Sequence, residues 1–219
     1  DGYKRSGRPM RQTAARKILS YWQALAPEDG APAQASVAPR ALKSFLPDLF
    51  LLERLDRSVF AFRMAGTRLC ARYGRELRDH DFVRLWPAAQ HGDILAALGR
   101  CLQDARPVTL EGAAATLDGK TVAFQVLLMP LTDAAGRTTR VLGAMLAADD
   151  QALRDGQILI SQTLDAAIDP LRSAAYAEPS LAFAAARETK VSFLRVVDGW
   201  KDGRAPARDA AANATLAAG

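Results

Sequence analysis

The nucleophilic and metal-ligating side chains of the chain are few and widely separated. It has two histidines, His80 and His91, and two cysteines, Cys70 and Cys101. No serine–histidine–acid set, paired general acid and base, or histidine–carboxylate cluster stands at usable spacing. The cysteines also lack the paired C-x-x-C spacing of a zinc site. The sequence therefore predicts no enzyme, no catalytic residues and no metal site.

Arg63 and Glu76 are the polar residues with the clearest potential role. Arg63 lies between Phe62 and Met64 in an apolar segment, and the alternation of a strand would let it point into the protein. A buried arginine needs a carboxylate, and Glu76 is the nearest candidate in sequence. We favour an internal ion pair. The alternative is an arginine that receives a carboxylate or phosphate of a ligand.

The elements that would position these residues begin with two strands and a short helix. Residues 50–55 and 59–64 are apolar and strand-like, and the turn residues Asp56-Arg57-Ser58 separate them. A helix should follow from Thr67, as its capping residue, to Tyr73. Gly74 can adopt the left-handed conformation that ends a helix.

The middle of the chain continues with helices and then strands. Apolar spacing predicts a short helix at residues 82–86, before Pro87, and a longer helix at 90–105. Three strands are expected at residues 108–117, 121–131 and 140–148, with Asp118-Gly119 as a hairpin turn between the first two. The predicted fold class is α+β, a five-stranded antiparallel sheet with helices on one face.

Three runs of sequence make the resemblance to a known family specific. They are LPDLFLLERLD from Leu46, FRMAGTRL from Phe62 and YGRELRDHDFVRLW from Tyr73. Together they resemble the PAS-like family found mainly in alphaproteobacteria, whose members are often a single sensory domain. The resemblance covers residues 21–149, roughly. It implies a PAS sheet and a sensory or adaptor function in signal transduction.

The resemblance also implies a ligand cavity on the helix-covered face. The candidate lining combines the aromatic residues of this face with the polar pair, although such side chains are more often packed core. The set is Phe62, Arg63, Glu76, Phe82, Trp86, Phe124 and Met129.

No cofactor is identified from the sequence. Relatives that bind haem use a histidine on the long helix, which makes His91 a candidate ligand, but a solvent-facing or capping role is favoured. His80, between two aspartates, is expected at the surface. Neither Cys70 nor Cys101 lies in the Asn-Cys-Arg-Phe-Leu-Gln segment of flavin photoreceptors; both are expected to be small core residues.

The N-terminal segment, residues 1–38, is basic and contains an amphipathic helix at residues 10–25, followed by a linker. Its apolar stripe comprises Ala14, Ile18, Tyr21, Trp22 and Leu25. Pattern alone leaves two roles open for this stripe. It covers the sheet of its own chain, or it forms a homodimer contact through Ile18, Tyr21, Trp22 and Leu25.

The remaining boundaries follow from composition. Residues 39–150 form the predicted PAS-like core, and residues 151–219 form a C-terminal extension with a possible helix at 150–164 and a strand at 191–199. The segment after residue 203 is alanine-rich and is expected to be disordered or loosely helical.

The overall composition is ordinary for a globular protein with a buried core. Apolar residues make up 49% and charged residues 24% of its 219 residues, and the net charge is +5. Much of that excess lies before residue 18, so nucleic-acid binding through the N-terminus is an alternative that we do not favour. No apolar run is long enough for a membrane span, and we expect a cytoplasmic protein whose partner is a small molecule or a regulatory protein.

Overall fold

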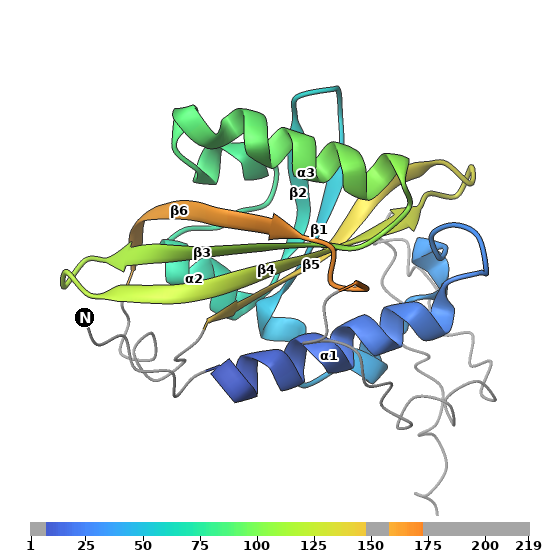
Figure 1. The fold of residues 1–219 in the computed structure, drawn as a ribbon, viewed down its shortest axis with the longest axis horizontal. Helices are drawn as coiled ribbons and strands as arrows, with labels where there is room; N and C mark the ends of the chain where they lie inside the picture. Colours follow the sequence, from blue (N-terminus) through green and yellow to red (C-terminus); the bar gives the residue numbers. More distant parts are fainter. Residues whose placement is uncertain (1–7, 148–157, 173–219) are drawn as a thin grey trace, which may run out of the picture. The chain divides into compact units, whose positions relative to one another are not determined.

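The computed structural model of the chain describes residues 8–147 and 158–172. Within these ranges the helices and strands follow the predicted order closely (Figure 1). They are α1 (Arg8–Leu25), β1 (Leu49–Arg54), β2 (Phe60–Ala65), α2 (Thr67–Tyr73), α3 (His91–Gln103), β3 (Val108–Thr116), β4 (Thr121–Thr132), β5 (Thr138–Ala147) and β6 (Leu159–Ile168). Short 3-10 helices connect them at Gln34–Ser36, Pro39–Leu42, Leu46–Asp48, Phe82–Leu85 and Ala88–Gln90.

The strands form one antiparallel sheet in the order β2-β1-β5-β4-β3-β6. The prediction of five strands is therefore corrected to six, and the helix expected at residues 150–164 is wrong where the structure describes this segment. β6 pairs antiparallel with the outer edge of β3, from Thr109 opposite Ile168 to Thr116 opposite Leu159 (Figure 1). This pairing satisfies the main-chain groups of β3 that would otherwise lack a strand partner.

The turns and the short helix follow from local sequence. Gly119 has a φ of 80°, the positive value that the tight turn between β3 and β4 requires. Gly74 ends α2 in the left-handed conformation, as predicted, with φ 62°. The predicted capping role of Thr67 is wrong: Thr67 is the first residue of α2, and Gly66 occupies the capping position. No side chain caps this end of the helix.

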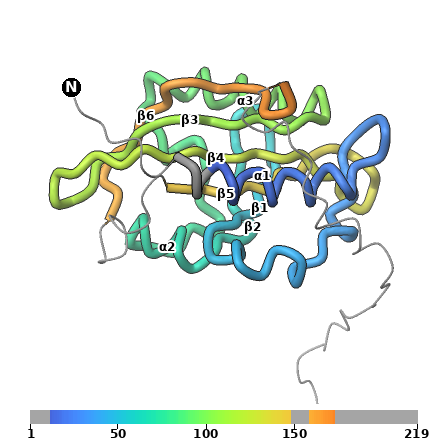
Figure 2. The backbone as a smooth tube through the Cα atoms, turned by 60° about the horizontal axis from the view of Figure 1, so that its bottom comes forward, coloured from blue at the N-terminus to red at the C-terminus, as the bar shows by residue number. Residues whose placement is uncertain are grey.

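Helices cover both faces of the sheet. The core helices α2 and α3 pack on one face, as expected, and the N-terminal helix α1 takes the other. α3 lies on one side and α1 on the other (Figure 1). The first face carries an apolar cluster that α2, α3 and the 3-10 helix Phe82–Leu85 complete. The second carries a separate cluster beneath α1, which runs across β4 and β5 (Figure 2).

The apolar stripe of α1 packs on the sheet of its own chain. Ile18, Tyr21 and Trp22 are each at most 5% exposed, and Leu25 packs partly buried beside them. The indole Nε1 of Trp22 donates to the carbonyl oxygen of Pro130 at 2.8 Å. The stripe is therefore occupied within the chain, so the residues expected at a dimer contact serve here as core. Whether a second copy also uses α1 stays a prediction.

No helix in the described part of the chain is both long enough and apolar enough to cross a membrane. The strand predicted at residues 191–199 and the alanine-rich segment after residue 203 lie outside the described residues.

Candidate functional site

Five aromatic side chains meet on the α3 face of the sheet. Phe50 and Phe62 lie on adjacent strands with ring centroids 5.5 Å apart, and Phe82 stacks on Phe50 at 5.6 Å. Trp86 follows, 6.2 Å from Phe82 and 5.8 Å from Phe124 of β4. These rings form one continuous aromatic cluster, so the side chains predicted to line a cavity are in contact with one another.

A capped turn positions the two aromatic residues that come from outside the sheet. The carboxylate of Asp81 accepts a hydrogen bond from the backbone N–H of Val83 at 3.1 Å and caps the 3-10 helix Phe82–Leu85. The chain then turns extended at Trp86, before Pro87. The side chains of Phe82 and Trp86 consequently point from this turn into the same cluster, where both are buried.

The indole nitrogen of Trp86 is the unusual feature of this cluster. The residue is 3% exposed, and Nε1 has no hydrogen-bond acceptor among the described residues. The backbone oxygen of Trp86, by contrast, accepts from Nε2 of His91 at 2.9 Å. A buried N–H without an acceptor costs about 1–3 kcal/mol. The cluster therefore contains a donor that an additional acceptor would stabilise.

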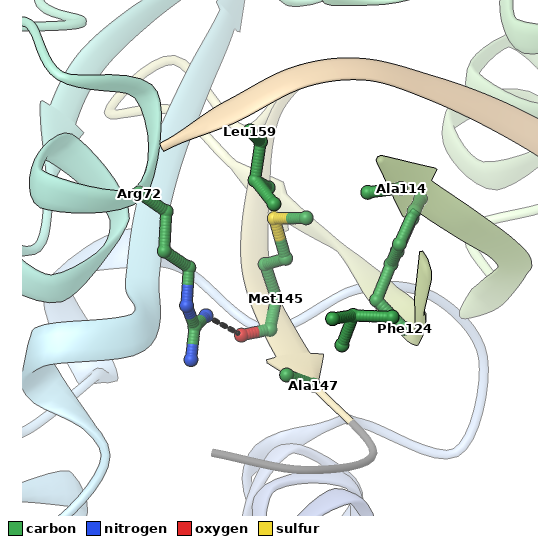
Figure 3. Close-up of a pocket in the computed structure, with 7 residues that line it drawn as sticks. Arg72, Ala114, Phe124, Met145, Ala147 and Leu159 are labelled. Carbon is green, nitrogen blue, oxygen red and sulfur yellow. Dashed lines mark hydrogen bonds between the residues drawn. The ribbon is translucent and has the colours of Figure 1, made fainter. Parts of the chain in front are cut away.

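A small pocket adjoins the cluster at Phe124. It encloses no room for a water molecule; the space of about 180 Å³ between its lining atoms includes a part open to solvent. It lies between α2 and the ends of several strands (Figure 3). The lining is apolar apart from one arginine and consists of Arg72, Ala114, Val122, Phe124, Met145, Ala147 and Leu159. Because Phe124 also contacts Trp86, this one ring belongs to both the pocket and the aromatic cluster.

Arg72 supplies the charge at the pocket. Its side chain is 3% exposed, and Nη1 donates to the carbonyl oxygen of Met145 at 2.9 Å (Figure 3). The same nitrogen lies 3.1 Å from the carboxylate of Asp48, which also pairs with Arg68 one helical turn earlier. The buried positive charge is thus compensated by Asp48, as a buried charge must be. Through Arg72, α2 is tied to the end of β5.

Tyr73, next in α2, ties the same helix to β6. Its hydroxyl donates to Oε1 of Gln162 at 2.5 Å and lies 3.6 Å from the sulfur of Met145. Burial raises the pKa of Tyr73 far above its ordinary value, so the phenol keeps its proton at physiological pH. α2 therefore contacts both β5 and β6 on either side of the pocket.

Gln90 makes a second contact with β6. Its side-chain Nε2 donates to the backbone oxygen of Leu164 at 3.0 Å, and the backbone N–H of Leu164 donates to its Oε1 at 2.9 Å. Gln90 is the last residue of the 3-10 helix Ala88–Gln90, immediately before α3. The segment that follows Trp86 is in this way joined to the outermost strand.

The structure brings together four of the seven predicted site residues. Phe62, Phe82, Trp86 and Phe124 all belong to the cluster on the α3 face. Met129 does not, because it lies in the cluster beneath α1 on the opposite face. Along β4 it is five residues from Phe124, an odd separation that places the two side chains on opposite faces.

The predicted ion pair between Arg63 and Glu76 is wrong. Phe62 points into the α3 face, so its neighbour Arg63 points away from it and is partly exposed. Arg63 Nε lies 2.5 Å from Glu53, and Nη1 lies 2.9 Å from Asp79. Glu76 is exposed and accepts instead from the backbone N–H of Leu77 at 3.0 Å.

The histidines and cysteines offer little for cofactor chemistry. His91 is half-buried at the start of α3, and its Nε2 is committed to the carbonyl of Trp86, which argues against an axial haem ligand. His80 is exposed. Cys101 is fully buried, and burial raises its thiol pKa, whereas Cys70 is half-buried rather than core. Among the described residues no group of three or more histidine, cysteine, aspartate or glutamate side chains could hold a metal ion.

Sequence reasoning missed the polar residues around the pocket. Arg72 and Arg68 stand one helical turn apart, a spacing that predicts a shared face, but their partner Asp48 precedes them by two strands. Gln90 and Gln162 carry no local pattern that distinguishes them from surface glutamines.

Comparison with known proteins gives a family and a fold. The family model described as "PAS domain" matches residues 10–146, which confirms the α+β prediction and the PAS resemblance. No curated protein matches.

The solved structures that match do so at low identity. A light-oxygen-voltage domain studied with a flavin analogue is 14% identical with a TM-score of 0.40, over 52% of this chain and 87% of that chain. An RNA-binding light-oxygen-voltage receptor is 18% identical with a TM-score of 0.40, over 59% of this chain and 39% of its own. The Vibrio cholerae VqmA dimer is 18% identical with a TM-score of 0.40, over 52% and 51%. The chain thus spans about half or less of the last two.

Proposed function

The chain belongs to the PAS domain family, and we propose that it is a sensory or adaptor protein that binds a small molecule on the α3 face of its sheet. The function of such a domain is sensory signalling. The observation that carries the proposal is the Trp86 indole N–H, buried in an aromatic cluster without an acceptor among the described residues. A ligand atom that accepts this hydrogen bond would offset the free energy that the unmet donor costs.

The surroundings define the class of molecule. The cluster and the adjoining pocket are almost entirely apolar, and the charge of Arg72 is already compensated by Asp48. A highly charged ligand would gain little there. We expect a small, mainly aromatic or aliphatic molecule with one carbonyl, ether or aromatic-nitrogen acceptor. Binding would require the rings around Phe124 to move, because they are packed in contact.

The output of the sensor is proposed to be a protein contact. The arrangement that supports a binding role over a catalytic one is the engagement of Tyr73, Arg72 and His91 in structural hydrogen bonds. Signalling would pass through a homodimer or a regulatory partner, in the manner of a two-state element whose equilibrium a ligand shifts. The two free thiols favour a reducing, cytoplasmic location.

The test uses the two buried tryptophans as probe and internal control. The indole N–H resonances of Trp86 and Trp22 would be assigned in ¹⁵N-labelled full-length protein with the variants Trp86→Phe and Trp22→Phe. Native mass spectrometry would first show whether a molecule co-purifies, and a fragment library would then be titrated. A ligand should shift the Trp86 resonance strongly and leave that of Trp22, already bonded to Pro130, in place.

Two results would contradict the proposal. One is a library and a native spectrum that yield no bound molecule. The other is a ligand that shifts the resonance of Trp22 and not that of Trp86, which would place binding on the α1 face.

A further inference from the structure

β6 is the last strand of the sheet, so one of its edges has no neighbouring strand in the described chain. An edge strand exposes backbone N–H and C=O groups that need other partners. Its exposed side chains include Ile160, at 60%, and its pairing with β3 is interrupted by two register shifts. β6 is consequently held less regularly than the strands inside the sheet.

The carboxamide of Gln90 substitutes for a strand at this edge. It donates to the oxygen and accepts from the N–H of one residue, Leu164, at 3.0 and 2.9 Å. This is the pair of bonds that a residue in a neighbouring antiparallel strand would exchange with Leu164. One side chain, 74 residues away in sequence, therefore fixes the outer edge of β6 at a single position.

A short, internally bonded turn joins Gln90 to Trp86. The backbone N–H of Gln90 donates to the oxygen of Pro87 at 2.8 Å, and Nε2 of His91 donates to the oxygen of Trp86 at 2.9 Å. Hydrogen bonds thus link the beginning of this turn to its end. A displacement of Trp86 would therefore move the turn as a unit and shift Gln90 with it.

We propose that Gln90 is the positioning residue through which the aromatic cluster controls the docking of β6 on the sheet. This inference rests on the proposed function, because the event that would move the turn is the binding of a ligand to Trp86. Withdrawal of the Gln90 carboxamide leaves the N–H and C=O of Leu164 without their partner and loosens the second half of β6. The half-buried side chains of Leu164 and Ala167 then become more exposed to solvent.

The first half of β6 is held separately. Tyr73 bonds to Gln162, and the side chain of Ile158 packs against Gly74 at the end of α2. Neither contact involves Gln90. The proposal therefore predicts a graded response along the strand, with residues 164–168 released before residues 159–162.

Backbone amide hydrogen exchange in the full-length protein, resolved by NMR, tests the contact itself. Gln90→Met keeps the length of the side chain and removes both bonds. We expect the amide of Leu164 to exchange about tenfold faster or more, residues 165–168 to follow, and residues 159–162 to change little. The matched control is Gln103→Met, an exposed glutamine at the other end of α3, which should leave β6 unchanged. Unchanged exchange at Leu164 in the first variant would overturn the proposal.

A double-mutant cycle tests the coupling to Trp86. Trp86→Phe should alter exchange at residues 164–168 when Gln90 is present, and should add less than twofold to the effect of Gln90→Met in the double variant. Strictly additive effects would refute the coupling. Neither measurement requires a ligand. If the two variants are coupled but the protein binds no small molecule, this inference stands and only the proposed function is refuted. If a small molecule binds but the effects of Trp86→Phe and Gln90→Met are additive, the proposed function stands and this inference is refuted.

Discussion

Each face of the sheet buries one tryptophan, and the two side chains differ in what their indole nitrogens contact. Trp22, beneath α1, is 4% exposed and donates to Pro130 at 2.8 Å. Trp86, on the α3 face, is 3% exposed and has no acceptor among the described residues. The α1 face is also mainly aliphatic on the sheet side, whereas five aromatic rings meet on the α3 face.

From this difference we infer that the α1 face holds its helix in place, whereas the α3 face is the one that responds to a ligand. On the α1 face the polar atoms of Tyr21 and Trp22 both bond to backbone groups; Trp22 fixes the helix to β4, and Tyr21 fixes it to Ala38 in the segment that follows the helix. On the α3 face an unmet donor, a pocket and three polar contacts to β5 and β6 lie together. A ligand that accepts from Trp86 would therefore change the α3 face while the bond of Trp22 on the α1 face stays in place.

The largest effect should come from the buried charge at the pocket. Arg72→Met removes the bond to Met145 and one of the two cations beside Asp48, and we expect a loss of about 3 kcal/mol in the free energy of unfolding. Arg68→Met is the matched control, since Arg68 pairs with the same carboxylate but is 46% exposed; it should cost less than about 1 kcal/mol. Urea denaturation of both variants measures the difference. Equal losses would show that burial does not distinguish the two arginines.

The two tryptophans allow the comparison to be tested directly. Trp22→Phe and Trp86→Phe remove similar volume, but only the first breaks a hydrogen bond and leaves the oxygen of Pro130 without its donor. Trp22→Phe should therefore be more destabilising by about 1–3 kcal/mol. Chemical denaturation of both variants provides the measurement. A larger loss for Trp86→Phe would mean that its indole nitrogen has an acceptor.

Some of this molecule could be predicted from sequence because the signals were local. The Asp118-Gly119 turn and Gly74 both mark positive φ values, and each fixed the end of its element. β6 gave no such signal. Its buried positions include Leu159 and Gln162, three residues apart, because register shifts interrupt the alternation that identifies a strand.

The site was predictable where strand alternation decided the face. Phe62 and Phe124 were placed correctly. The same rule, applied strictly, would have assigned Arg63 and Met129 to the opposite face. The pairs Arg72 with Asp48 and Gln90 with Leu164 were beyond such rules, because they depend on which distant segments the folded sheet brings together.

A third, smaller effect concerns the junction of α2 with β6. Gly74→Ala places a Cβ at a positive φ, 2.9 Å from Cδ1 of Ile158, and should cost about 1–2 kcal/mol while loosening the start of β6. Gly99→Ala in α3 is the control, because nothing lies near its added methyl and alanine favours a helix; it should stabilise by about 0.5–1 kcal/mol. Thermal unfolding distinguishes them. A neutral Gly74→Ala would show that the junction is loose already.

The smallest effect belongs to the exposed ion network at the rim of the α1 face. The hydrogen bond from Arg63 lowers the pKa of Glu53, with Arg140 contributing. A lowered folded-state pKa stabilises the fold above the pKa of the unfolded chain, and this contribution disappears as the pH falls through the folded-state value.

Glu53→Gln should therefore destabilise slightly at neutral pH, and the difference from the unmodified protein should vanish in acid. Urea unfolding at several pH values measures it, with Glu28→Gln in an exposed loop as the control. A difference that persists at low pH would mean that Glu53 acts through packing rather than charge.

The bond between Trp22 and Pro130 spans 108 residues, and its consequence appears while the chain is being made. α1 leaves the ribosome well before the strands that cover its apolar stripe, β4 and β5, which emerge only after most of the domain has been translated. A nascent chain of intermediate length therefore carries an uncovered amphipathic helix, which is a binding site for chaperones. Late closure of such a distant contact also predicts slow refolding compared with helical proteins of the same size, and the completion of β5 as the step that commits the domain to its fold.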